Sequence, residues 1–328
     1  MPAFKALVVN KTDHKVTVQP QMLRLEDLPE GDLLIHAAYS SMNYKDALAC
    51  VENGQIVKQY PFVPGIDLAG TVVESGSERF QAGDEVIVTG YGLGVSHFGG
   101  FSEYARVPAE WALKLPEGLT LREAMILGTA GLTAALSVRE LRQNGIYPES
   151  GPVLVTGASG GVGSISAAIL AKLGYEVTAS TGKADMHDSL YGLGVKHILS
   201  REELHATAKR PLGKQLWAGA VDCVGGATLA AIMANIKYGG AVAASGVTGG
   251  AELALTVFPF IIRGVKLLGI DSVMVAMDKR MKVWELLAGA YKPDMLDDMC
   301  KEIGLEQLGD QVEVMLRGES RGRMVVKL

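Results

Sequence analysis

A short β-branched stretch followed by three regularly spaced glycines constrains this chain more than any other feature. Residues 153–156 (Val-Leu-Val-Thr) predict a buried strand, and Gly157, Gly160 and Gly163 follow it. The apolar, alanine-rich residues 165–173 then have helical periodicity, and a second strand is predicted directly after them. Strand, glycine turn and helix in this order form a βαβ unit that can hold a dinucleotide. Glycine lets the backbone approach a pyrophosphate, and the helix N-terminus presents free N–H groups.

The cofactor contacts predicted from this unit begin at the turn and the helix start. They are Gly157, Ser159, Gly160, Gly161, Val162 and Gly163. NAD-binding proteins place an Asp or Glu about 20 residues past the glycines, where it bonds the ribose 2′-hydroxyl. This chain instead has Ser180, Thr181 and Lys183 there, and no carboxylate. Hydroxyl groups and a positive charge suit a 2′-phosphate, so the sequence predicts NADP(H). A solvated surface lysine is the other interpretation of Lys183.

Composition limits the classes of protein to which the chain can belong. With 328 residues, 48% hydrophobic and 20% charged, it is long enough for two domains. Its net charge of −5 argues against a nucleic-acid partner. The longest apolar run, residues 258–270, contains proline and charged residues and is shorter than the roughly 18–20 residues that span a membrane. We therefore expect no membrane segment and, without an N-terminal signal-like core, a cytoplasmic protein.

The cysteines and histidines do not predict a metal site. Cys50, Cys223 and Cys300 are widely spaced and form neither a disulfide framework nor a C-x-x-C motif. The six histidines are scattered, without an i, i+4 pair. We therefore expect no metal ligands, and we interpret Cys50 and Cys223, which lie in apolar surroundings, as inert thiols.

Turn signals divide the chain into two kinds of structure. Up to about residue 120 the pattern predicts a small β-barrel, with strands at residues 4–9, 33–39, 68–73 and 85–89. From Leu121 onward helical and strand patterns alternate, which predicts a parallel doubly wound sheet. The helices expected there are residues 121–127, 132–141, 186–193 and 229–236. The strands expected there are residues 197–199, 220–224, 241–245 and 265–270, and a helix at 279–288 and a strand at 324–328 follow.

Five motifs together resemble those of the medium-chain dehydrogenase/reductases. They are Asn43-Tyr-Lys-Asp46, Pro64-Gly-Ile-Asp-Leu-Ala-Gly70, Gly99-Gly-Phe-Ser-Glu103, Gly128-Thr-Ala-Gly-Leu-Thr133 and the run from Val153 to Gly163. The resemblance covers nearly the whole chain. Within this family the chain most resembles one subgroup, the YhdH/AcuI-type quinone oxidoreductases, which are NADPH-dependent acrylyl-CoA reductases. Two further motifs fit that subgroup, Trp217-Ala-Gly-Ala-Val-Asp222 and Gly269-Ile-Asp-Ser-Val-Met274.

The resemblance implies an α/β fold in two parts. A Rossmann doubly wound parallel sheet that binds NADP, residues 124–263, is inserted in a GroES-like β-barrel catalytic domain, residues 1–123 and 264–328. The predicted strand 265–270 would be an edge of the nucleotide sheet. Because relatives pair this strand with its copy, which covers an exposed edge, we expect a homodimer.

The wider family includes zinc alcohol dehydrogenases, whose ligand motifs this chain lacks. Residues 43–46 stand where a cysteine ligand motif would be, and Gly65-Ile66-Asp67 stands where Gly-His-Glu would be. The resemblance therefore implies metal-free hydride transfer from NADPH to the C=C bond of a short α,β-unsaturated acyl-CoA, acryloyl-CoA to propionyl-CoA. Two alternatives stay open. One is an NADPH:quinone or activated-alkene reductase, and the other is a non-catalytic NADPH-binding protein.

The resemblance places Tyr44, Asn43 and Asp67 at the chemistry. The Tyr44 phenol could position the cofactor, bond the substrate carbonyl or donate a proton. An aromatic side chain with its hydroxyl on the backbone is the alternative. Asn43 could bond substrate or hold its turn. Without a metal we expect Asp67 to hold Lys45 or the surrounding loop in place, and Lys45 could instead pair with Asp46.

The remaining cofactor contacts are implied by position. Thr129 resembles the stretch that lies beside the nicotinamide, although capping of the following helix is an alternative. Val247, Asp271 and Ser272 follow predicted strands, where the dinucleotide lies in such sheets. Arg323 could reach a phosphate of the cofactor or of CoA, with a solvent-exposed arginine as the other interpretation.

Overall fold

Two compact units make up the protein, whose computed structural model describes residues 3–12, 15–208 and 210–328. The first unit holds the chain up to Thr129 together with Val273–Ala288 and Leu296–Leu328. The second holds Ala130–Ser272 and Gly289–Met295. We expected divisions after residues 123 and 263. The observed divisions come later, because one helix continues past the first of these positions and a strand of the second unit's sheet follows the other.

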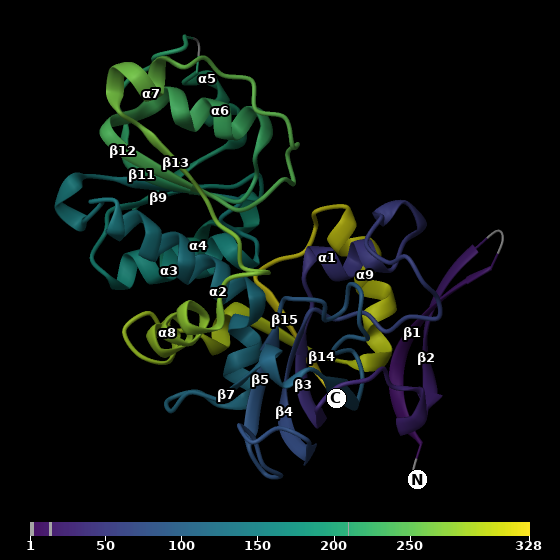
Figure 1. The fold of residues 1–328 in the computed structure, drawn as a ribbon. Helices are drawn as coiled ribbons and strands as arrows, with labels where there is room; N and C mark the ends of the chain where they lie inside the picture. Colours follow the sequence, from purple (N-terminus) through teal and green to yellow (C-terminus); the bar gives the residue numbers. More distant parts are fainter. Residues whose placement is uncertain (1–2, 13–14, 209) are drawn as a thin grey trace. The chain divides into compact units, whose positions relative to one another are not determined.

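The second unit is built on one parallel sheet with helices on both faces. Over the described residues the strand order is β10-β9-β8-β11-β12-β13, and every pairing is parallel. The strands are β8 (Val153–Thr156), β9 (Val177–Ser180), β10 (His197–Leu199), β11 (Trp217–Asp222), β12 (Ile236–Ala244) and β13 (Lys266–Gly269). Figure 1 shows α3 (Gly161–Lys172) and α4 (His187–Gly192) on one face, and α5 (Arg201–Ala206), α6 (Gly226–Asn235) and α7 (Phe258–Arg263) on the other. The predicted doubly wound sheet is confirmed.

The turn between β8 and α3 requires glycine at two positions. Gly157 has a φ of +59°, in the left-handed region that favours glycine. A Cβ on Gly163 would lie 2.3 Å from the carbonyl oxygen of Gly157, so the helix can approach the turn only without a side chain there. Gly160 is the N-cap of α3 and no side chain caps this end, which leaves the first helical N–H groups available to a ligand.

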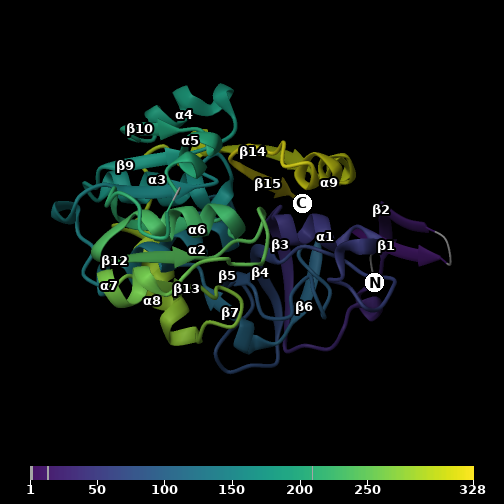
Figure 2. The same cartoon turned by 90° about the horizontal axis from the view of Figure 1, so that it is seen from above.

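The first unit contains a mostly antiparallel sheet and a hairpin. The sheet order over the described residues is β14-β15-β3-β4-β5-β7, with β6 beside β3. Its strands are β3 (Leu33–Ser41), β4 (Asp67–Ser75), β5 (Glu85–Thr89), β6 (Tyr104–Val107), β7 (Ala112–Lys114), β14 (Cys300–Gly304) and β15 (Arg323–Lys327). The helices are α1 (Tyr44–Ala49), α8 (Met277–Ala288) and α9 (Leu308–Leu316). Figure 2 shows the hairpin of β1 (Phe4–Thr12) and β2 (Lys15–Leu23) at the side of this sheet.

Each unit has a hydrophobic core of its own. In the second unit Leu154 and Val242 of the sheet pack with Ile232 of α6 in one buried cluster. In the first unit a buried cluster around Leu68 and Val88 lies within the sheet. Each of these two clusters consists of residues from one unit.

The element α2 (Leu121–Gln143) leads from the first unit into the second. We predicted two helices there, at 121–127 and 132–141, and this is confirmed, because α2 consists of two helices joined at a kink, where the backbone of Gly128 is non-helical. Its length and apolar composition satisfy the criterion for a membrane-spanning helix. The prediction that no apolar segment approaches that length is therefore wrong. Of its most apolar window 78% is buried, so α2 is a core helix.

Elements with weak or polar patterns were not predicted from the sequence. They are β2, β6, β7, β14, α1, α5, α7 and α9. Strand β2 has no buried residue, and although Val16 and Val18 alternate with polar residues, Pro20 interrupts this pattern, since proline is rare inside a strand. Strands with a strong pattern were predicted well, and β5, β8 and β10 have the expected bounds.

We expect Gly163→Ala to lower the free energy of unfolding by about 1–3 kcal/mol, because its methyl group would collide with backbone rather than with a flexible side chain. Urea unfolding followed by circular dichroism measures this loss. Gly192→Ala is the matched control, since Gly192 lies in α4 and a Cβ there would meet open space. A loss in Gly163→Ala no larger than in the control would contradict the close approach.

Candidate cofactor and active site

The glycine turn and the end of β9 are joined by hydrogen bonds. Thr181 Oγ1 donates to Ser159 Oγ at 2.9 Å, and the Lys183 N–H donates to Thr181 Oγ1 at 3.1 Å. Ser180 and Thr181 are buried. The structure therefore brings together the residues predicted from the βαβ unit, at the edge where the parallel strands end.

A residue not predicted from the sequence also lies at this edge. The Arg201 guanidinium lies over Gly182, where a Cβ on the glycine would be 3.4 Å from Nη2. Arg201 is the first residue of α5, which follows β10, and β10 is the neighbour of β9 in the sheet. The strand order could have revealed it, because residues that follow neighbouring parallel strands meet at one edge. Arg201 thus adds a positive charge beside Thr181 and Lys183.

Asp222 fixes the ends of β8 and β11. Its Oδ1 accepts a hydrogen bond from Thr156 Oγ1 at 2.6 Å, and its Oδ2 accepts one from the Gly225 N–H at 2.8 Å. Burial raises the pKa of this carboxyl above its ordinary value. From the sequence we predicted no role for Asp222 beyond its place in a motif. In the structure it supports the backbone next to the glycine turn.

The other predicted contacts in the second unit follow the last two strands. Val247 lies after β12 and is 65% exposed. Asp271 is exposed and Ser272 is buried, and both follow β13. Ser272 Oγ accepts a hydrogen bond from Thr133 Oγ1 at 2.8 Å. All three residues therefore lie beyond the carboxyl ends of parallel strands.

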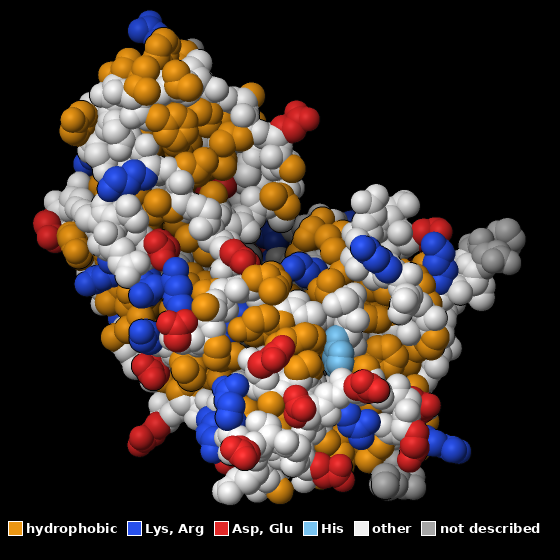
Figure 3. All heavy atoms as spheres, viewed as in Figure 1, with side chains coloured by type: hydrophobic (Ala, Val, Ile, Leu, Met, Phe, Trp, Pro, Cys, Tyr) orange, Lys and Arg blue, Asp and Glu red, His pale blue; other side chains and the backbone are white. Residues whose placement is uncertain are grey.

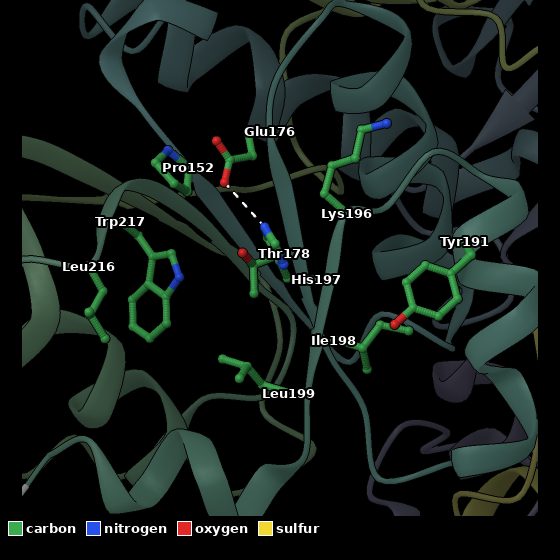
Figure 4. A pocket seen from close by; sticks show the side chains of 10 residues that line it. All are labelled: Pro152, Glu176, Thr178, Tyr191, Lys196, His197, Ile198, Leu199, Leu216 and Trp217. Carbon is green, nitrogen blue, oxygen red and sulfur yellow. Dashed lines mark ion pairs between the residues drawn. The ribbon is translucent and has the colours of Figure 1, made fainter.

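A cavity of about 500 Å³ lies at the opposite edge of this sheet (Figure 4). Its lining includes Pro152, Glu176, His197 and Trp217, which stand at or just before the starts of β8, β9, β10 and β11. His197 Nε2 lies 3.4 Å from Glu176 Oε1 across it. Ligands of doubly wound sheets bind at the carboxyl ends of the strands, so this cavity is not the dinucleotide site.

A second polar cluster lies in the first unit around the buried carboxylate of Asp67. Oδ2 accepts hydrogen bonds from Ser41 Oγ at 2.6 Å and from Asn43 Nδ2 at 2.7 Å. Oδ1 accepts a hydrogen bond from Thr129 Oγ1 at 2.5 Å, and the Thr129 N–H lies 3.0 Å from Oδ2. Of the two roles that we expected for Asp67, it holds the surrounding loop, through Asn43, and Thr129 as well, but it does not hold Lys45. Gly128 permits this approach, since a Cβ there would be 2.6 Å from Asp67 Oδ2.

Asp46 is a second buried carboxylate in this cluster. It accepts hydrogen bonds from the N–H groups of Asn43 at 2.8 Å and Ile66 at 2.9 Å. Burial, reinforced by the negative charge of Asp67, raises the pKa of Asp46 to about 7. In the described part of the chain Asp46 makes no ion pair with Lys45, so that predicted pair is wrong. Asp46 instead fixes the start of α1, where Asn43 is the N-cap.

Arg323 is buried in the same cluster rather than exposed. Its Nε donates to the Ile126 carbonyl at 2.7 Å, and Nη2 donates to Ser41 Oγ at 2.8 Å. Nη1 lies 3.3 Å from Asn43 Oδ1. Arg323 is only 3% exposed. The other interpretation, a solvent-exposed arginine, is therefore wrong, because the guanidinium is held inside the first unit beside the two carboxylates, and contact with a cofactor or CoA phosphate stays a prediction.

Tyr44 is the predicted catalytic residue that remains accessible. It is the first residue of α1, directly after Asn43, and is 41% exposed. Among the described residues its hydroxyl has no hydrogen-bond partner, so the alternative of a hydroxyl bound to the backbone is wrong. The cluster therefore orients Asn43 through both ends of its side-chain amide and presents the neighbouring phenol to solvent.

The thiols and histidines of the described residues do not form a metal site. No group of three or more His, Cys, Asp or Glu residues in the described part of the chain could hold a metal ion. Burial raises the pKa of both Cys50 and Cys223 to about 12. Both thiols therefore stay protonated near neutral pH, as expected for unreactive cysteines.

Comparison with known proteins identifies relatives along the whole chain. Residues 29–117 match the family model described as an alcohol dehydrogenase GroES-like domain, and residues 161–288 match the one described as a zinc-binding dehydrogenase. AcuI of Ruegeria pomeroyi, named acrylyl-CoA reductase, is 49% identical over 325 residues, which are 98% of each protein.

Solved structures of similar proteins contain dinucleotides. The yhdH oxidoreductase of Salmonella enterica, in complex with NADP, is 46% identical with a TM-score of 0.96 over 99% of each chain. YhfP of Bacillus subtilis, named as a quinone oxidoreductase, is 51% identical over 326 residues, 99% of each protein. Its structure with NAD bound has a TM-score of 0.98 over 100% of each chain.

We expect Asp46→Asn to change how stability depends on pH. The pKa of Asp46 is raised in the folded protein, so its carboxyl favours folding below about pH 4, and this contribution is lost as the pH rises to about 7. Relative to Asp46→Asn, the wild-type protein should therefore lose stability over that interval. Urea unfolding at several pH values measures the difference.

Asp84→Asn is the control for that measurement. Hydrogen bonds from the Gln81 N–H and from Lys114 lower the pKa of Asp84, so its replacement should have an effect that is constant between about pH 5 and 8. A constant difference for Asp46→Asn over the same interval would show that this carboxyl is already ionised at pH 5.

Proposed function

Because the chain belongs to the medium-chain dehydrogenase/reductase family, and within it to the acrylyl-CoA reductase and quinone oxidoreductase type, we propose that it reduces a short α,β-unsaturated acyl-CoA with NADPH. The substrate that we propose is acryloyl-CoA and the product is propionyl-CoA. The observation that carries this proposal is the full-length identity of 49% to a protein named acrylyl-CoA reductase.

The residues of the second unit fit NADPH. Helix α3 approaches the turn at Gly157 so closely that there is no room for a Cβ at Gly163. The uncapped N-terminus of α3 suits a pyrophosphate. Arg201 and Lys183 would offer positive charge to the 2′-phosphate, and Thr181 would offer a hydroxyl. The solved structure of the Salmonella enterica relative with NADP supports this choice of cofactor.

The residues of the first unit suit the chemistry of such a reduction. When bound, NADPH supplies the hydride that the β-carbon of the acceptor receives. The thioester oxygen then carries negative charge and needs a hydrogen-bond donor, and the α-carbon needs a proton. We assign Tyr44 to one of these two roles, because its phenol is exposed. Asn43 and Asp67 are positioning residues in this proposal, since they bind each other and the start of α1.

A quinone or another activated alkene is the second candidate substrate class. The relative named as a quinone oxidoreductase, at 51% identity, supports it. A quinone needs the same donor beside its oxygen, so Tyr44 would serve both substrates. A protein that binds NADPH without turnover is the remaining alternative.

The test of the proposed function is NADPH oxidation by the purified, chelator-treated protein. We expect acryloyl-CoA to have a specificity constant at least about tenfold above that of a simple quinone at matched concentrations. Turnover of the quinone alone would replace the proposal by the second substrate class. NADPH binding without oxidation, with either acceptor, would instead indicate the non-catalytic protein.

We expect Arg201→Ala to raise the KM for NADPH by about tenfold or more, because a hydrogen bond to a charged group is lost, while the KM for NADH changes little. Steady-state kinetics with both nucleotides measures this. Lys196→Ala is the control, since it removes the same charge at the opposite edge of the sheet. Equal effects of the two substitutions would remove Arg201 from the phosphate site.

We also propose that the protein is a homodimer formed through β13. This strand is one edge of the parallel sheet, and three of its four residues are exposed. Hydrophobic side chains gather over α7 and the residues beside it (Figure 3). Ile261 is 71% exposed, Ile262 53%, Val257 61% and Phe258 43%. An exposed edge with an apolar neighbour favours pairing with a second copy.

Analytical ultracentrifugation tests the dimer. We expect the wild-type protein to sediment at twice the chain mass of 34.7 kDa, and Ile261→Lys to sediment as a monomer. Tyr191→Lys is the control, because Tyr191 is also exposed but lies on α4. A dimer in Ile261→Lys would exclude this face.

A further inference from the structure

A buried arginine of the first unit, outside the cluster around Asp67, joins three segments. Arg280 of α8 is fully buried. Its Nη1 donates to the carbonyl oxygen and to Oγ1 of Thr89, both at 2.8 Å, and its Nη2 donates to the Val273 carbonyl at 2.9 Å. The guanidinium also lies 4.5 Å from the centre of the Tyr91 ring. These contacts join the end of β5, the loop after it and the segment that follows Ser272.

Tyr91 is held in a backbone conformation that side chains rarely adopt. Its φ is +51°, although the neighbouring Gly90 and Gly92 show that the loop uses glycine freely. Its N–H donates to the Val273 carbonyl at 3.1 Å, and its hydroxyl donates to the Val275 carbonyl at 3.3 Å. A strained residue persists where its surroundings fix it, and such residues cluster at functional sites. The contacts of Tyr91 with Val273, Val275 and Arg280 therefore stabilise this strained backbone conformation.

The chain passes between the units at two points that involve predicted site residues. Thr129 is the last residue of the first unit before the second begins, and Val273 is the first residue after it returns. Asp67 holds Thr129, and Arg280 joins Val273 to Thr89. Asp67 and Thr89 are register partners in the pairing of β4 with β5. Thr129 and Val273, where the chain leaves and re-enters the first unit, are thus both held at the paired residues Asp67 of β4 and Thr89 of β5.

We propose that Tyr91 and Arg280 are positioning residues that clamp residues 273–275, and so hold the chain next to Ser272 in fixed relation to Asp67. The expected effect on turnover rests on the proposed function, in which Ser272 contacts the cofactor. The expected effect on amide hydrogen exchange of residues 273–275 does not rest on the proposed function. Hydride transfer is sensitive to small displacements, because the reacting atoms must be close and aligned.

Tyr91→Gly tests the clamp without adding backbone strain, since glycine adopts a φ of +51° freely. Gln55→Gly is the matched control, because Gln55 has a φ of +56°, is exposed and lies outside these contacts. Two quantities are measured in each folded variant. The first is amide hydrogen exchange of residues 273–275 without substrate, and the second is kcat and the KM for NADPH.

We expect Tyr91→Gly to exchange about tenfold faster at residues 273–275 and to lose about tenfold or more in kcat, with the KM for NADPH within about twofold of wild type. Gln55→Gly should change neither. Arg280→Lys keeps the charge but loses the forked donor geometry, and should shift both quantities in the same direction.

Unchanged exchange at residues 273–275 in Tyr91→Gly would overturn the clamp, whatever the activity. Faster exchange with an unchanged kcat would overturn its positioning role. If the wild-type protein reduces no acceptor, the proposed function fails, and the exchange measurement still decides whether the clamp exists.

Discussion

The buried carboxylate of Asp67 is the interaction on which the first unit's polar cluster depends. Removing a charge from water is costly unless hydrogen bonds and opposite charge replace the solvent. Here Ser41, Asn43 and Thr129 donate the hydrogen bonds. The positive charge is that of Arg323, whose guanidinium donates to the same Ser41 hydroxyl. The donors come from β3, the N-cap of α1 and the bend of α2. One carboxylate therefore fixes three separate parts of the chain at once, and with them the residue that follows Asn43, Tyr44.

The second unit differs from the first, because a ligand site needs hydrogen-bond donors that no protein group occupies. Its parallel strands bring the ends of β8, β9 and β11 to one edge, and hydrogen bonds at that edge engage Asp222, Ser159 and Thr181. Asp222 accepts the hydrogen bond of the Gly225 N–H. The N–H groups at the start of α3 have no side-chain cap and are available to a ligand. Rigidity around an unfilled set of donors is what a phosphate site requires.

The fold was largely predictable from the sequence, because its signals are local. The glycine spacing at Gly157 to Gly163, the apolar strands and the missing acid near Thr181 can each be seen within about 30 residues. What could not be predicted depends on pairing between distant strands. Arg201 reaches the end of β9 only because β10 is its neighbour, and Arg323 is buried only because β15 lies beside β3. Strand β2 was missed because Pro20 interrupts its alternation of valines and polar residues.

The bend of α2 also limits how such a protein can be recombined. The helix belongs to the first unit up to Thr129 and to the second from Ala130 onward, and the non-helical Gly128 lies directly before that junction. A chimaera that receives its nucleotide-binding unit from another enzyme can keep a continuous helix and still fail. Its junction must retain glycine at position 128, since any side chain there would enter the space of Asp67 and Ser41. The exchangeable module therefore begins after Thr129, and not at the start of the helix that leads into it.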